Sequence, residues 1–305
     1  MNQPNPAIVA QSAVRRLPRA ALWLFCLAYV LPGFIGRAPW RRDDIVAFAY
    51  MLELADGVSH WLRPTVQGLA PDLPALLPYW LGAVAIQIAP AGFPADLAVR
   101  IPFIGLLLLT LFATWYGTYQ LARGPDAQPV AFAFGGEAAP PDYARALADG
   151  ALLALIACLG LAQPAHETTP MLAQLCFSAL AFYGFAALPY RLWGPAIGAC
   201  LGLLGLALSG APSLAVIFGF GGLLALLPAA HQDPTDARAL KHRRLATAGL
   251  IGLIGVVALL ASVMELWRWH LVMPAWSAAY WLAQGNLLIW FTWPAWPLVL
   301  WTLWR

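Results

Sequence analysis

Residues 101–122 read IPFIGLLLLTLFATWYGTYQLA, and this stretch decides the fold class of the chain. It holds 22 consecutive residues without a charged side chain, and a helix needs roughly 20 apolar residues to cross a bilayer. The whole chain shares this character: of 305 residues, 61% are hydrophobic and only 10% are charged, and the mean hydropathy is +0.71. Soluble domains carry about 25% charged residues. The sequence therefore predicts an all-α polytopic membrane protein with no nucleic-acid partner, and it excludes disordered classes.

Seven further apolar runs lead us to expect about eight transmembrane helices. These runs are Ala20–Gly36, Leu147–Ala162, Met171–Leu188, Gly194–Leu208, Pro212–Leu227, Leu245–Glu265 and Asn286–Trp304. The first run follows a basic segment, residues 1–19, and no small-x-small cleavage site follows it, so we interpret it as an uncleaved helix. The 15 tryptophans agree with repeated crossing of lipid–water interfaces, where Trp is enriched.

The stretch Leu73–Ala89 decides the orientation of every later loop, because it too is apolar enough to span. If it stays at the surface, most of the 17 basic residues fall on the cytoplasmic side, as the positive-inside rule requires. If it crosses, most fall outside. Two prolines near its start, Pro74 and Pro78, also suit a helix lying in the interface. We therefore expect cytoplasmic termini and a large external loop, residues 37–99, with two membrane-parallel helices, Ile45–Leu54 and Leu73–Ala89.

The expected organisation is a cytoplasmic segment, residues 1–19, followed by a single transmembrane domain, residues 20–305. Residues 123–146 and 230–244 form cytoplasmic loops in this scheme. Ionisable side chains are almost absent from the expected spans, which argues against an ion pathway through the bilayer. Chemistry is therefore expected at the outer face.

Five charged residues follow the first expected span and form the densest candidate site. They are Arg37, Arg41, Arg42, Asp43 and Asp44. Guanidinium groups at a headgroup surface attract a phosphate, and one of two adjacent carboxylates can face a pocket while the other caps the next helix. A solvated turn with a helix cap explains the same residues.

Other polar residues of the outer side each have two interpretations. Asp72, near Tyr79, suits either sugar binding or a turn before a helix, and Arg100 either reaches headgroups or holds a phosphate. His166 and Glu167 form either a site or an exposed polar loop between two spans. His270, within Trp-Arg-Trp-His, belongs to an aromatic belt or to a site.

Taken together, three segments resemble the polyprenyl-phosphate-dependent GT-C glycosyltransferases, over most of residues 20–230. They are Trp40-Arg-Arg-Asp43-Asp44, Gly68…Leu77-Pro78-Tyr79-Trp80 and Ala98-Val99-Arg100. Residues 165–170 and 205–210 match more weakly. The nearest families in this resemblance are the aminoarabinose transferases of lipid A and the bacterial relatives of protein O-mannosyltransferases.

The resemblance implies an inverting glycosyltransferase of the bacterial inner membrane with its active face in the periplasm. A polyprenyl-phosphate-linked sugar is the implied donor, and a periplasmic lipid, glycan or protein is the acceptor. Asp43 stands at the position of the catalytic base, with Asp44 beside it. The remaining implied roles are donor-phosphate binding by Arg41, Arg42 and Arg100, and sugar or acceptor binding by Asp72, Tyr79, His166, Glu167 and His270. No cofactor is identified, and a divalent metal stays open.

The chain departs from the family pattern at four positions that are usually charged. Leu73 and Pro74 stand where a Glu-Lys pair is usual, Thr169 replaces an Asp, and Ser209 replaces a Lys. The chain is also shorter than is usual in the family, so the resemblance is to a minimal or shortened member. Two alternatives follow from these departures: altered donor recognition, or a non-catalytic GT-C-like protein that binds a lipid-linked sugar or a membrane partner.

Overall fold

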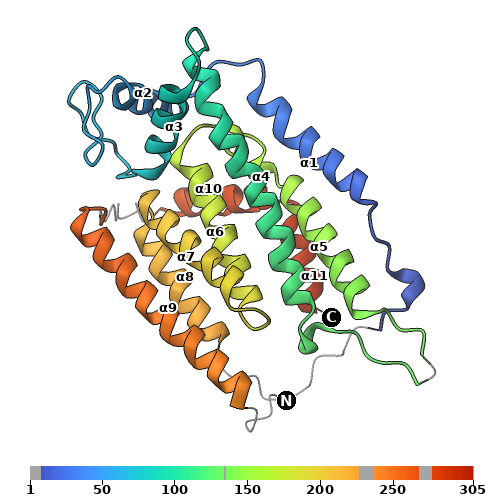
Figure 1. Ribbon diagram of the computed structural model, residues 1–305. Coiled ribbons are helices and arrows are strands. Elements are labelled where there is room, and N and C mark those ends of the chain that lie inside the picture. Colours follow the sequence, from blue (N-terminus) through green and yellow to red (C-terminus); the bar gives the residue numbers. More distant parts are fainter. Residues whose placement is uncertain (1–7, 134, 227–236, 268–276, 305) are drawn as a thin grey trace.

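The computed structural model describes residues 8–133, 135–226, 237–267 and 277–304. Within these ranges the regular structure is helical and contains no β-sheet. The helices are α1 (Arg19–Phe34), α2 (Arg42–Ala55), α3 (Leu77–Ile88), α4 (Ala95–Ala122), α5 (Pro140–Ile156), α6 (Pro170–Ala187), α7 (Trp193–Leu208), α8 (Pro212–Ala225), α9 (Ala237–Val263), α10 (Ala278–Phe291) and α11 (Ala295–Trp304). Most of the helices run along one common direction, and α2 and α3 lie across one end of this bundle (Figure 1).

Three helices are long and apolar enough to cross a membrane: α4, α6 and the Leu240–Val263 part of α9. A fourth candidate is a bent pair, in which α5 continues into the segment Leu159–His166 after a turn of 56°. The expected membrane character is thus supported. The expected number of eight full-length spans is wrong for the described residues, and by helix length it becomes three or four.

Turn-forming residues explain why the other apolar runs give shorter helices. α1 and α7 have 16 residues each and α8 has 14, which is roughly 21–24 Å at 1.5 Å per residue and less than a hydrocarbon core of about 30 Å. α7 ends before Gly210, whose φ is +85°, a conformation that favours glycine. The last expected span is interrupted between Phe291 and Ala295, where Pro294 separates α10 from α11.

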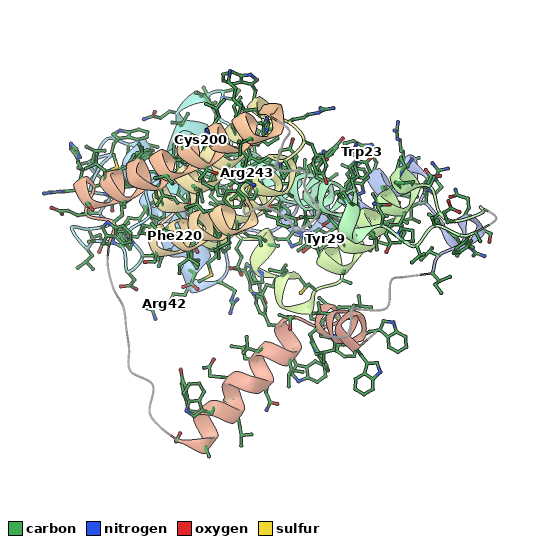
Figure 2. All side chains as sticks on the ribbon, turned by 90° about the horizontal axis from the view of Figure 1, so that it is seen from below. Trp23, Tyr29, Arg42, Cys200, Phe220 and Arg243 are labelled. Atoms are coloured by element: carbon green, nitrogen blue, oxygen red, sulfur yellow. The ribbon has the colours of Figure 1, made fainter. Side chains whose placement is uncertain are left out.

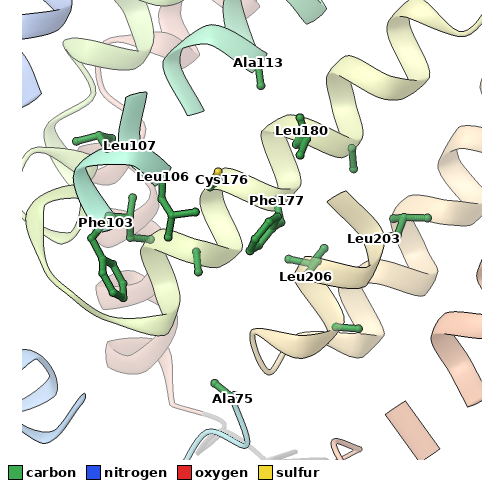
Figure 3. Packing of buried hydrophobic residues seen from close by; sticks show 14 of the residues in the cluster. Ala75, Phe103, Leu106, Leu107, Ala113, Cys176, Phe177, Leu180, Leu203 and Leu206 are labelled. Carbon is green, nitrogen blue, oxygen red and sulfur yellow. The ribbon is translucent and has the colours of Figure 1, made fainter. Parts of the chain in front are cut away.

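The hydrophobic core centres on α6, which packs between α4 and α7 (Figure 3). Small residues bring α6 and α7 together. A Cβ added to Gly202 would lie 2.5 Å from the backbone nitrogen of Ala181, and one added to Gly184 would lie 2.5 Å from that of Ala199. Helices in membranes associate through close packing at such small residues. The glycines of these apolar runs therefore have a packing role that hydropathy does not report.

The helices of the first loop form a hairpin over the end of the bundle. Met51 of α2 packs on Gly82 of α3, where a Cβ would lie 2.2 Å from the Met51 sulfur. The backbone N–H of Leu76 donates to the carbonyl of Leu208 at 2.8 Å and so ties the start of α3 to the end of α7. α3 has 12 residues, a rise of roughly 18 Å, which is too short to cross the hydrocarbon layer. This length agrees with the surface position that the charge distribution predicted for Leu73–Ala89.

α10 and α11 stand apart from the layer formed by the other helices (Figure 2). No residue of α10 is buried. Its contact with the body of the protein runs through the segment after α5: the Leu159 N–H donates to the Trp293 carbonyl at 3.0 Å, and the Cys158 thiol lies 3.1 Å from the Phe291 carbonyl. A helix that is apolar on every side suits contact with lipid.

Candidate functional site

The connection between α5 and α6, residues 163–169, passes beside the end of α1 and the start of α2. Four consecutive polar side chains of this connection are buried, from His166 to Thr169. Of the two interpretations of His166 and Glu167, the exposed polar loop is therefore wrong. The loop is short, but α1 and α4 pack against it and Asp44 of α2 bonds to it. Hydropathy along the chain does not report this cover.

The imidazole of His166 is wedged against α1. Its two nitrogens lie 2.8 Å from the carbonyl oxygens of Ala162 and Tyr29, and its ring packs 4.8 Å from that of Tyr29 and 5.5 Å from that of Phe34. A Cβ on Gly33 would lie only 2.0 Å from the ring, so the ring occupies the space of a missing side chain. These contacts hold α1 against the α5–α6 connection.

Asp43 and Asp44 lie in the first turn of α2 and differ sharply in their surroundings. Asp44 is 3% exposed, and its Oδ1 accepts hydrogen bonds from the backbone N–H of Thr168 at 2.8 Å and from its hydroxyl at 2.6 Å. Asp43 is exposed. Both carboxylates lie in the first turn of α2, where the partial positive charge of a helix N-terminus favours anions. One carboxylate is committed to the fold and the other is available to a ligand.

The three arginines around the start of α2 differ in how many of their donors are occupied. Arg37 donates to the carbonyl of His166. Arg41, whose side chain is half-exposed, lies 3.6 Å from the carboxylate of Glu167, which is buried and also accepts from Gln163 at 3.2 Å. Arg42 is exposed and makes no hydrogen bond or ion pair to any of the described residues. The cation with the freest donors beside Asp43 is therefore Arg42.

Arg100 lies inside the protein, at the start of α4. It is 5% exposed, and it donates to the carbonyl of Phe34 at 2.8 Å and to the carboxylate of Asp96 at 3.1 Å. A guanidinium has five N–H donors, so some remain for a ligand. Its first effect is nevertheless to join α4 to the end of α1.

Tyr79, predicted to contact a sugar, is buried between α3 and α2, and its ring lies 5.2 Å from that of Tyr50. The Tyr50 hydroxyl donates to the carbonyl of Leu69 at 3.1 Å. Asp72 is exposed nearby. Burial raises the pKa of Tyr79, and the neighbouring Tyr50 and Asp72 raise it further. Burial and the charges of Asp72 and Glu53 likewise raise the pKa of Tyr50. Both phenols are therefore hydrogen-bond donors at neutral pH.

The structure thus brings together Asp44, Arg41, His166 and Glu167, which we call the Asp44 cluster. Tyr79 lies farther away, beside Tyr50 of α2. Tyr50 follows Asp43 by seven positions, roughly 10 Å of helix. His270 lies outside the described residues. Within the described residues, no three histidine, cysteine or acidic side chains gather closely enough to hold a metal ion.

Sequence reasoning missed Thr168 in this region and Asp149 at the opposite end of the bundle. Thr168 is the partner of Asp44, and only the fold brings the two together. The buried hydroxyl of Thr169 has no hydrogen-bond partner among the described residues. Asp149, on α5, is 3% exposed and accepts from the Trp115 indole N–H at 2.8 Å. Asp149 did carry a signal, since it is a lone carboxylate inside the expected span Leu147–Ala162.

Comparisons of the chain with family models, with curated proteins and with solved structures give no match.

Proposed function

We propose that this chain is a membrane glycosyltransferase of the GT-C type, which transfers a sugar from a polyprenyl-phosphate donor to a periplasmic lipid, glycan or protein. One observation carries the proposal. Of two adjacent carboxylates, Asp44 is buried on Thr168 while Asp43 stays exposed on the same helical turn. An exposed carboxylate on an anchored helix end is what a general base at a membrane surface needs.

In this proposal Asp43 takes the proton of the acceptor hydroxyl or amine as that atom attacks the anomeric carbon. The bond from the anomeric carbon to the phosphate oxygen breaks, and its electron pair leaves with the polyprenyl phosphate. Negative charge therefore grows on the phosphate, and Arg42 is the nearby cation with unused donors to stabilise it. Arg41 contributes in addition if it exchanges Glu167 for the phosphate.

The proposal includes a location and an orientation. The chain lies in a bacterial inner membrane with both termini in the cytoplasm, and the α2–α3 hairpin faces the periplasm. The concentration of basic residues on the opposite side supports this orientation. The donor then approaches through the membrane and the acceptor from the periplasm.

Lipid mass spectrometry on purified protein tests the proposal, with Asp43→Asn beside the wild type. We expect a polyprenyl-phosphate sugar to remain intact on the variant and to be consumed by the wild type when acceptor is present. Asp56→Asn, an exposed carboxylate at the other end of α2, is the matched control and should behave as the wild type does. Unchanged transfer by Asp43→Asn would refute the role of Asp43.

A second function is favoured by a separate observation. Arg41 and Arg100, two of the three candidate phosphate ligands, already contact Glu167, Asp96 and the Phe34 carbonyl. A protein that only binds a lipid-linked sugar needs less free positive charge than one that stabilises a leaving phosphate. Equal amounts of intact donor lipid on the wild type and on Asp43→Asn would select this binding function.

A further inference from the structure

A second feature lies at the far end of the bundle, where α1, α4 and α5 enclose a cavity of about 530 Å³. Its lining includes Tyr119 near the end of α4, whereas Arg100 lies near the start of that helix. These two residues are 19 positions apart, roughly 28 Å of helix, which is close to the thickness of a hydrocarbon core. The cavity and the Asp44 cluster therefore lie at opposite membrane faces if α4 spans the bilayer.

The cavity has a basic rim. Arg16, Arg19 and Arg145 contribute three guanidinium groups to the lining, against the carboxylate of Asp142 in the lining and that of the buried Asp149 behind it. Arg16 pairs with Asp142 at 3.0 Å, and Arg145 donates to the carbonyl of Leu17 at 3.3 Å. Arg19 makes no hydrogen bond or ion pair to the described part of the chain. The rim therefore keeps an excess of positive charge and unused donors.

The deeper walls are apolar and aromatic. Leu22 and Trp23 of α1 and Phe112 and Trp115 of α4 line the cavity, and the rings of Trp23 and Phe112 pack edge to face with their centroids 5.1 Å apart. Figure 2 labels Trp23 on α1. A phosphate ion alone would leave these walls uncovered, whereas a molecule with a phosphate and a hydrocarbon chain covers both parts.

Asp149 fixes the geometry of the rim. Its two carboxylate oxygens accept from the backbone N–H of Leu17 at 3.1 Å and from the Trp115 indole at 2.8 Å. Leu17 lies between Arg16 and Arg19, so this buried anchor holds the basic segment against α4 and α5. Gln11 adds a second attachment through Asp142 at 2.9 Å. The rim is thus built before a ligand arrives, which reduces the ordering cost of binding.

We propose that this cavity binds an anionic phospholipid of the adjacent leaflet. The phosphate lies among Arg16, Arg19 and Arg145, and an acyl chain lies along Trp23 and Phe112. Guanidinium groups donate paired hydrogen bonds to phosphate, and basic pockets between membrane helices bind anionic headgroups. This inference rests on the membrane character of the chain and not on the proposed glycosyl transfer.

Native mass spectrometry of the full chain tests the proposal, with phosphatidylglycerol and phosphatidylcholine offered at equal concentration. We expect phosphatidylglycerol to be retained at least tenfold more strongly. The variant Arg19→Gln/Arg145→Gln should lose this preference. Arg15→Gln/Arg244→Gln removes the same charge from exposed positions outside the cavity and should keep it. Arg19→Gln alone should weaken binding and serves if the double variant fails to fold.

Three results would overturn the proposal. Equal retention of the two lipids would show that the rim does not select an anionic headgroup. Equal loss in the rim and control variants would show that only net surface charge matters. Displacement of the lipid by millimolar inorganic phosphate, with no effect of Trp23→Ala, would identify a free phosphate as the ligand instead. A loss of lipid in Trp23→Ala supports the acyl-chain contact.

Discussion

The Asp44 carboxylate accepts two hydrogen bonds from Thr168, one from the backbone N–H and one from the hydroxyl, across 124 positions of sequence. This contact joins the first turn of α2 to the α5–α6 connection. It divides two adjacent aspartates into a structural residue and an exposed one, because successive side chains of a helix point about 100° apart. The candidate site therefore depends on a structural contact that takes no part in the proposed reaction.

Asp44→Ala should lower the free energy of unfolding by about 1.5–3 kcal/mol, since hydrogen bonds to a charged group are lost and the Thr168 donors stay buried. Thermal unfolding in detergent measures the change. Thr168→Ser retains the hydroxyl and should cost less than Thr168→Ala. In a double-mutant cycle, Asp44→Ala and Thr168→Ala should be strongly non-additive; additive effects would mean that the two side chains do not interact.

Gly33→Ala should destabilise the protein by about 1–3 kcal/mol, because the new methyl group overlaps the His166 ring. The double variant Gly33→Ala/His166→Ala relieves the overlap and should recover part of the loss in a thermal-unfolding assay. Gly150→Ala is the control, since nothing lies within 4 Å of a Cβ there. If Gly33→Ala and Gly150→Ala have equal effects, the close packing of His166 against α1 is wrong.

Gly202→Ala should also destabilise the protein, and by more than an exposed helix glycine would. Its Cβ meets backbone atoms of α6 at 2.5–2.7 Å, and a backbone yields less easily than a flexible side chain. The expected cost is about 1–3 kcal/mol. Gly221→Ala, where nothing lies within 4 Å, should leave the unfolding temperature unchanged or raise it, since Ala favours helix. If Gly202→Ala changes the unfolding temperature as little as Gly221→Ala does, the close packing of α6 on α7 is contradicted.

The raised pKa of Tyr79 predicts a loss of stability at high pH. The folded-state pKa of Tyr79 lies above the unfolded value of about 10. The contribution of its protonated phenol to the free energy of unfolding is therefore fully present below pH 10 and is lost as pH rises through the folded-state pKa. Tyr79→Phe should flatten the fall in unfolding temperature above pH 10. When phenolate formation is followed by ultraviolet absorbance, the variant should also lack the tyrosine that titrates at the highest pH. If Tyr79 loses its proton at the same pH as exposed tyrosines do, its burial is contradicted.

Much of the helical organisation was predictable, because apolar runs and turn residues act locally. The expected helix Ile45–Leu54 lies within α2, and the long run Ile101–Ala122 lies within α4. The number of full-length spans was not predictable by counting runs. Hydropathy averages over a window, whereas single residues such as Gly210 and Pro294 end a helix and shorten it below a membrane thickness.

For the candidate site, the sequence by itself determined which side chains follow the first span, and therefore that Asp43 and Asp44 share one helical turn with cations beside them. Only the tertiary structure decided which carboxylate is exposed, and that His166 and Glu167 are buried. The reason is physical: burial and partners come from α1 and from the α5–α6 connection, more than 100 residues away in sequence. A local pattern carries no record of such contacts.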